Sequence, residues 1–216
     1  ASKNQEQLSC FSGTSPELGL EFLKKFGAKR YYLDIFDCDA DYKDEHLRLS
    51  EAFVIKGWAS LINYENDDWI KGMAMDIDKT TPVKQALVAT QNPVTLGLAT
   101  DNSFGSALFT DTYTPTAAEK ADPVAASFTE DGYLKGGHAV AVIGYDDARQ
   151  SFLIMNSWGP SWGKDGYIWM KYDDFNDFVI LAYMMETYEQ ELPTKGCVFG
   201  DCNNSYSRYV FDNGDI

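Results

Sequence analysis

Long hydrophobic runs are missing from this sequence of 216 residues, and basic residues are few. No apolar stretch approaches the roughly 20 residues that a membrane-spanning helix needs, so we expect no membrane span. The 33 Asp and Glu residues outnumber the 18 Lys and Arg residues, which gives a formal net charge of −15 at pH 7. A surface of this charge repels phosphate backbones, so nucleic acid is not an expected partner. Hydrophobic residues make up 44% of the chain, enough for one substantial domain or two small lobes that share a cleft.

Histidine is also scarce, with two in the chain, so the search for a general base is short. His46 lies in the charged stretch 42–46 and is most simply a solvated surface residue. His138 follows two glycines and begins the apolar run 139–145. This position places a titratable ring at the mouth of a strand where backbone can approach closely. We predict neither a metal site nor another cofactor.

The apolar pattern predicts helices early in the chain and strands later. The stretch Ser15-Pro16-Glu17 is typical of a helix start, and Gly27 is expected to end that helix. A second helix is predicted over 82–90, before a strand at 94–99. The later strands, as in a small antiparallel barrel or sheet, are predicted at 139–145, 151–155, 166–171 and 178–185.

Three other segments allow more than one interpretation. Residues 56–63 fit a strand and 67–76 a helical turn, but their periodicity does not separate the alternatives. The aromatic and hydroxyl-rich segment 104–114, with the loop after it, fits either the wall of a cleft or a surface connection.

A carboxamide follows one of the predicted strands. Asn156 comes directly after the strand 151–155, and two neighbouring antiparallel strands would bring it next to His138. An amide oxygen there would accept the ring N–H and fix the tautomer, which leaves the other ring nitrogen to face a nucleophile. Trp158 would keep water away from that hydrogen bond.

These residues belong to a longer pattern, which comprises Gly137-His138-Ala139-Val140, Gly144-Tyr145, Asn156-Ser157-Trp158-Gly159, Trp162-Gly163 and Gly166-Tyr167. In order and spacing it resembles the histidine and asparagine motifs of the papain-like cysteine peptidases, peptidase family C1. The resemblance implies that His138 pairs with a catalytic thiolate, that Asn156 orients its ring, and that Trp158 shields the pair and lines the leaving-group side of a cleft. It also places Trp162 and Gly137 in this shielding and cleft region. Gly137 is a departure, because many relatives carry Asn or Asp there.

The nucleophile is harder to find. Cys10 precedes His138 by close to the roughly 130–150 residues that the family's spacing leads one to expect. The residues around it, however, lack the family's Gln, Gly, Ser, Cys and Trp pattern, and the next helix begins only near Ser15. The resemblance implies instead a disulfide between Cys10 and Cys38. The two remaining cysteines, Cys197 and Cys202, would then close a small loop in the tail. Two disulfides would place the protein in an extracellular or lumenal compartment, whether secretory, lysosomal or vacuolar.

The predicted fold is α+β, with two lobes like those of papain. Residues 1–80 are expected to form an incomplete helical lobe, 81–188 an antiparallel β-barrel-like lobe that holds His138 and Asn156, and 189–216 a tail. The resemblance covers about the last three quarters of such a domain and lacks the segment that carries the nucleophile and the oxyanion donors. We therefore expect the chain to be stable only when that segment or a partner covers its exposed apolar surface.

The predicted function is hydrolysis of peptide bonds in peptide or protein substrates, as a secreted, disulfide-containing thiol protease. The nucleophile would come from a missing N-terminal segment or from a partner chain. The alternative is a noncatalytic pseudopeptidase that acts as a binding or structural subunit. A hydrolase with a Ser or Thr nucleophile is a weaker third hypothesis, because the sequence has no Gly-x-Ser-x-Gly turn.

Overall fold

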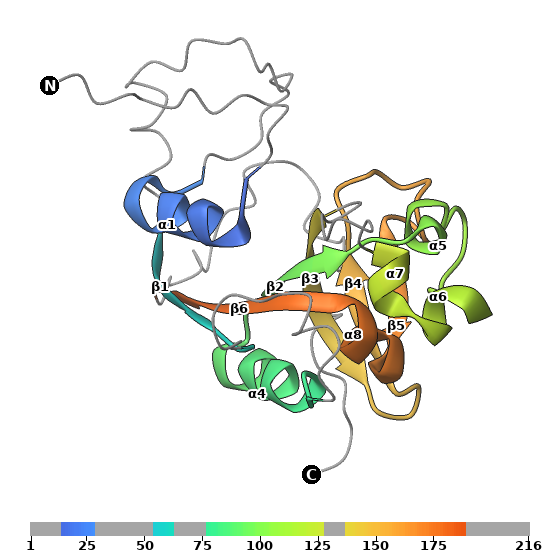
Figure 1. The fold of residues 1–216 in the computed structure, drawn as a ribbon. Helices are drawn as coiled ribbons and strands as arrows, with labels where there is room; N and C mark the ends of the chain where they lie inside the picture. Colours follow the sequence, from blue (N-terminus) through green and yellow to red (C-terminus); the bar gives the residue numbers. More distant parts are fainter. Residues whose placement is uncertain (1–13, 29–53, 63–76, 128–136, 189–216) are drawn as a thin grey trace, which may run out of the picture.

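A six-stranded antiparallel sheet forms the centre of the fold in the computed structural model, which describes residues 14–28, 54–62, 77–127 and 137–188. The strand order is β1-β6-β2-β3-β4-β5, and every neighbouring pair is antiparallel (Figure 1). The strands are β1 (Ile55–Ser60), β2 (Val94–Ala99), β3 (Gly137–Asp146), β4 (Ser151–Met155), β5 (Tyr167–Lys171) and β6 (Val179–Thr187). The α+β fold with an antiparallel sheet is therefore confirmed.

The helices lie before, between and after the strands. They are α1 (Pro16–Phe26), α4 (Thr80–Thr90), α5 (Asn102–Gly105), α6 (Ala117–Ala121), α7 (Pro123–Ser127) and α8 (Tyr172–Phe178). Helix α1 has the predicted ends: the Ser15 side chain accepts a hydrogen bond from the N–H of Leu18, and Gly27 ends the helix at a positive φ of 75°. Helix α4 begins two residues before the predicted 82–90 segment and ends at the left-handed Gln91.

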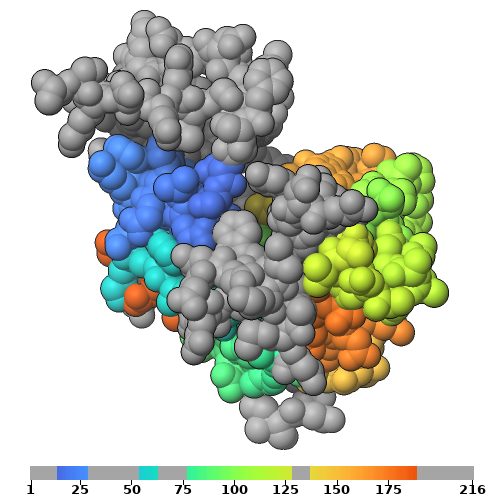
Figure 2. Space-filling model, in the orientation of Figure 1, coloured from blue at the N-terminus to red at the C-terminus, as the bar shows by residue number. Residues whose placement is uncertain are grey.

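The two longest helices pack on opposite faces of the sheet, and Figure 1 shows them on either side of β6. Alternate residues of β6 point to opposite faces, so Ala182 joins the core beneath α4, while Leu181 and Tyr183 join the core beneath α1. The indole N–H of Trp58 in β1 also donates to Glu21 of α1 at 2.8 Å. In Figure 2 the surfaces of α1 and β1 meet directly, whereas α5, α6 and α7 gather at the other end of the molecule.

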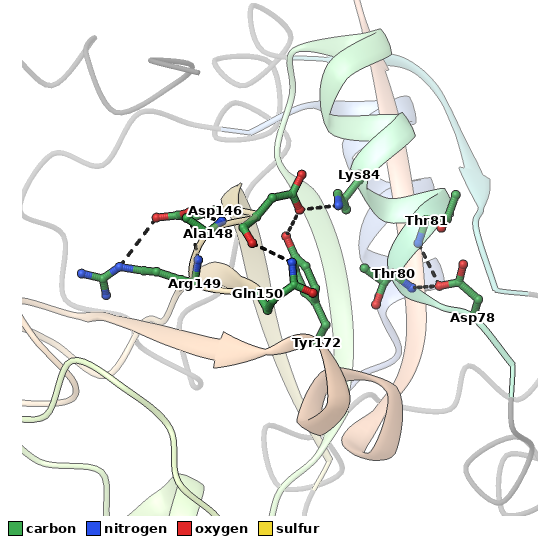
Figure 3. A network of polar contacts seen from close by, with 10 residues as sticks. Asp78, Thr80, Thr81, Lys84, Asp146, Ala148, Arg149, Gln150 and Tyr172 are labelled. Carbon is green, nitrogen blue, oxygen red and sulfur yellow. Dashed lines mark hydrogen bonds and ion pairs between the residues drawn. The ribbon is translucent and has the colours of Figure 1, made fainter. Parts of the chain in front are cut away.

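A polar network joins the turn between β3 and β4 to two helices (Figure 3). The ammonium of Lys84 in α4 lies 2.5 Å from a carboxylate oxygen of Asp147, and the hydroxyl of Tyr172 donates to the same oxygen at 2.8 Å. The Lys84 ammonium also lies 4.9 Å from the centre of the Tyr172 ring. These contacts hold the far end of the β3–β4 hairpin against α4 and α8.

Several sequence interpretations are resolved by the fold. Residues 56–60 form a strand, β1, and the loop after 114 contains α6 and α7. Helix α8 was not predicted. The predicted boundary at residue 80 stays a prediction, and β1, which precedes it, pairs with β6, which follows it. The segment 67–76 and the tail 189–216 lie outside the described residues. In the part of the chain that the structure describes, no helix is long and apolar enough to cross a membrane.

Candidate active site

His138 and Asn156 are brought together by neighbouring strands. His138 is the second residue of β3, where it pairs with Leu98 of β2, and Asn156 is the residue directly after β4. The His138 Nε2 atom lies 2.7 Å from the Asn156 Oδ1 atom. The backbone N–H of Asn156 donates to the carbonyl of Gly166 at 3.0 Å, which fixes the residue beyond the end of its strand. The predicted contact between imidazole and carboxamide is therefore present.

The hydrogen bonds around the amide decide which ring nitrogen carries the proton. The backbone N–H of Ser157 donates to Asn156 Oδ1 at 2.7 Å. A backbone N–H can only donate, so the amide oxygen, and not its nitrogen, faces this side. The His138 Nε2 atom must then donate to the same oxygen. In the neutral ring the lone pair is consequently on Nδ1, which is the nitrogen able to accept a proton.

Trp158 covers one face of this pair. Its ring stacks on the His138 ring with centroids 4.3 Å apart and an angle of 29° between the planes. The Trp158 side chain keeps 44% of its surface exposed. An indole in this position keeps water from one face of the imidazole.

A second aromatic side chain, Phe104 of α5, touches the same pair. Its ring centroid lies 6.3 Å from that of His138 and 5.9 Å from that of Trp158. Phe104 is 2% exposed, and its backbone carbonyl accepts the indole N–H of Trp162 at 2.9 Å. The aromatic and hydroxyl-rich segment 104–114 stands out in the sequence, but nothing in its pattern distinguishes Phe104 from the other residues. Phe104, the first residue of that segment, contacts the imidazole, and both interpretations of the segment as a whole stay predictions.

Glycine is required where the chain turns from Trp162 toward β5. Gly163 has a positive φ of 58°, and a Cβ atom there would lie 2.2 Å from the carbonyl oxygen of Tyr167. The N–H of Gly163 donates to the carbonyl of Ala107 at 2.6 Å, which ties this turn to the segment that follows α5. The Trp-Gly pair of the sequence pattern therefore serves to bring the site's loop against the segment that carries Phe104.

Comparison with known proteins agrees with this arrangement. The sequence profile described as Papain family cysteine protease matches residues 65–187, which is more than half of the chain. The chain belongs to the papain family of cysteine proteases. Among the solved structures, xylellain, a cysteine protease from Xylella fastidiosa, superposes with a TM-score of 0.57 at 22% sequence identity, over 85% of this chain and 65% of that chain. The papain-like fold that the sequence predicted is confirmed.

Curated relatives of this papain-family chain match it over stretches of different lengths. Cathepsin B-like CP2 of Giardia intestinalis is 55% identical over 42 residues, which are 18% of this chain and 14% of the relative. An uncharacterized peptidase C1-like protein of Acanthamoeba polyphaga mimivirus is 27% identical over 161 residues, which are 74% of this chain and 47% of the relative. The chain thus spans less than half the length of these relatives.

The remaining predicted site residues differ in their positions. Gly137 is exposed at the start of β3, opposite Ala99. Trp162 is 2% exposed, with its ring edge-on to Trp158 at 5.8 Å. It therefore lies behind Trp158, not at the surface. Other predicted residues lie outside the described ranges, namely His46, Cys10, Cys38, Cys197 and Cys202, so both disulfides stay predictions. Within those ranges, no three His, Cys, Asp or Glu side chains gather as metal ligands would.

Proposed function

We propose that this chain supplies the histidine and asparagine of a papain-type thiol protease, and that the nucleophilic cysteine comes from a segment outside residues 1–216. The observation that carries the proposal is the hydrogen bond from His138 to Asn156 beneath Trp158. This bond leaves Nδ1 of His138 as the proton acceptor. A thiol next to Nδ1 would transfer its proton to the ring, which gives a thiolate and an imidazolium.

The chemistry follows from that ion pair. The thiolate attacks the carbonyl carbon of a peptide bond, and His138 returns its proton to the leaving amine as the C–N bond breaks. The resulting thioester is then hydrolysed by a water molecule, whose proton His138 accepts while the hydroxide adds to the carbonyl. The collapse of this adduct releases the carboxylic acid and the thiol. In both steps Asn156 holds the ring in the orientation that directs Nδ1 at the sulfur.

The surface of α1 supports a nucleophile from another segment. Leu18 and Phe22 lie one turn apart on this helix and are 57% and 47% exposed. The ring of Phe22 is 4.9 Å from that of Phe26, which continues the apolar surface for a further turn. Such a surface is suited to packing against another helix. We propose that the segment with the catalytic cysteine, either N-terminal to this chain or on a partner, packs here.

Substrate and location follow from the same proposal. Peptides or proteins are the substrates of such a site, and the proposed disulfides of Cys10 with Cys38 and of Cys197 with Cys202 suit an extracellular or lumenal compartment. The alternative function, a noncatalytic binding or structural subunit, is less well supported. It gives no reason for an oriented imidazole under an exposed indole.

The test is to label the native protein with a thiol-directed epoxide, after determining its intact mass and N-terminal sequence. We expect one rapidly labelled cysteine, on a peptide outside residues 1–216. His138→Gln should lower the labelling rate by on the order of a hundredfold or more, because the thiolate loses its imidazolium partner. His46→Gln removes the other histidine and should leave the rate unchanged. Rapid labelling of Cys10 would refute the outside nucleophile, and the absence of any rapidly labelled cysteine would favour the noncatalytic alternative.

A further inference from the structure

Asp101 is a buried carboxylate directly before α5, close to the proposed active site. It is 6% exposed. One of its oxygens accepts the backbone N–H of Phe104 at 2.7 Å, and the other accepts the hydroxyl of Tyr113 at 2.5 Å. Both donors are neutral, and burial raises the pKa of the carboxyl above its usual value. Serine or asparagine would cap a helix without the cost of burying a charge, so capping alone does not explain an aspartate here.

Both hydrogen bonds of Asp101 end on residues of one aromatic cluster. Phe104 packs against His138 and Trp158, as described above. The Tyr113 ring, 2% exposed, lies edge-on to Phe104 with centroids 5.7 Å apart. Asp101 therefore holds the backbone of Phe104 and the hydroxyl end of Tyr113, whose ring packs against the Phe104 ring.

The segment that carries Phe104 has little support of its own. Helix α5 is four residues long, and a single turn has no independent stability in water. Asp101 holds its first turn through the N–H of Phe104, and Trp162 holds the carbonyl of the same residue. Ser103 of the same helix also donates to the Glu119 carboxylate, through its hydroxyl at 2.6 Å. The position of the Phe104 ring against the imidazole thus depends on a small number of polar contacts, two of them made by the backbone of Phe104 itself.

We propose that Asp101 is a positioning residue for His138, which acts through Phe104 and Tyr113 to hold the imidazole in the orientation that directs its Nε2–H at Asn156. This inference rests on the proposed function, since it assigns Asp101 to the same site. Without the carboxylate, α5 shifts, the Phe104 ring no longer confines the imidazole, and the hydrogen bond to Asn156 weakens. The ring then populates the Nδ1–H tautomer, in which Nδ1 cannot accept a proton.

The experiment measures the tautomer of His138 directly, by NMR of the native protein with ¹⁵N-labelled histidine, after the epoxide has alkylated any reactive thiol and at a pH where the ring is neutral. The chain has two histidines, so His46→Gln assigns the signals. We expect the ratio of the Nε2–H to the Nδ1–H tautomer to fall by roughly three- to tenfold in Asp101→Ala, the size of one weakened hydrogen bond. Asp101→Asn should stay within about twofold of the wild type, because its amide can still accept from Phe104 and donate to the Tyr113 oxygen.

The matched control is Ser15→Ala, which removes the side-chain cap of α1, away from His138. It should lower stability as a lost cap does and leave the tautomer ratio unchanged. If Asp101→Ala does not fold, Phe104→Leu carries the test, because it keeps the cap and removes the ring. It should lower the ratio by a similar factor.

Two outcomes would overturn the inference: a wild-type ratio in Asp101→Ala or Phe104→Leu, or an equal fall in Ser15→Ala. The tautomer measurement does not need a catalytic thiol, so it separates this inference from the proposed function. If the epoxide labels the expected cysteine but the tautomer ratio of His138 does not change in Asp101→Ala, the role of Asp101 alone is refuted. If the ratio falls as expected but no cysteine is labelled, the proposed function alone is refuted.

Discussion

The buried Lys79 provides a quantitative prediction of stability against pH. Its side chain is inaccessible to solvent, and its Nζ donates to the carbonyls of Asn176 at 2.5 Å and Val179 at 2.9 Å. Burial lowers the pKa of Lys79 from 10.5 to about 8, although the nearby Asp177 offsets part of this effect. The ammonium is therefore less stable in the folded protein than in the unfolded chain.

The size and sign of the effect follow from these two pKa values. At about 1.4 kcal/mol per pH unit, the difference between 10.5 and about 8 corresponds to on the order of 3 kcal/mol. Between these pH values the unfolded chain keeps a proton that the folded protein has released, so the free energy of unfolding rises with pH. The neutral amine still has two N–H groups, enough for both carbonyls. Relative to Lys79→Met, the free energy of unfolding of the wild type should therefore rise by up to about 3 kcal/mol between about pH 8 and pH 10.5.

The assay is urea unfolding of the wild type and of Lys79→Met at about pH 7, 8.5 and 10. The other titrating groups are common to both proteins, so they cancel in the difference between the two free energies of unfolding. Lys171→Met, which removes an exposed lysine, controls for the loss of one positive charge. A difference between wild type and Lys79→Met that stays constant from about pH 7 to 10 would refute the reasoning.

Two further predictions concern a turn and the polar network of Figure 3. Gly163→Ala should lower the free energy of unfolding by about 3 kcal/mol or more, because its Cβ would clash with the Tyr167 carbonyl at a positive φ. The control is Gly19→Ala, where a Cβ meets nothing within 4 Å, so stability should stay the same or rise slightly. Equal melting temperatures of Gly163→Ala and Gly19→Ala would contradict the predicted clash. The Lys84 hydrogen bond, and then that from Tyr172, hold the pKa of Asp147 below its ordinary 3.8. The stabilisation that the Asp147 carboxylate gives is therefore present above about pH 4 and is lost as the pH falls through its pKa in the folded protein. Because the carboxylate is exposed, this stabilisation is below about 1 kcal/mol. Acid unfolding of wild type and Asp147→Asn should thus converge at low pH.

Local signals explain what could be predicted from the sequence. Ser15, Pro16 and Gly27 each favour a helix end through their own backbone or side chain, so the ends of α1 needed no knowledge of the rest of the fold. The contact of His138 with Asn156 required only that β3 and β4 pair as neighbours, which a short turn between them makes natural.

Contacts between distant segments could not be predicted in the same way. Helix α8 was missed because Tyr172, Phe175 and Phe178 are aromatic residues that favour strands as well, and their three-residue spacing shows helix only once they are known to be buried together. Phe104 was missed because its contact with His138 depends on the pairing of β2 with β3 and on the turn of α5 beyond it. Side-chain packing of this kind depends on the assembled fold.

The position of β6 in the sheet has a consequence for how the protein assembles during translation. This strand lies between β1 and β2, and Ile55 at one end of β1 pairs with Thr187 at the far end of β6. The run from β2 to β5 can form as successive neighbours while the ribosome is still elongating the chain. Among the described strands β1 has no other neighbour, so its pairing must wait until the last of these strands has emerged. Formation of this long-range pair is expected to be a slow step of folding.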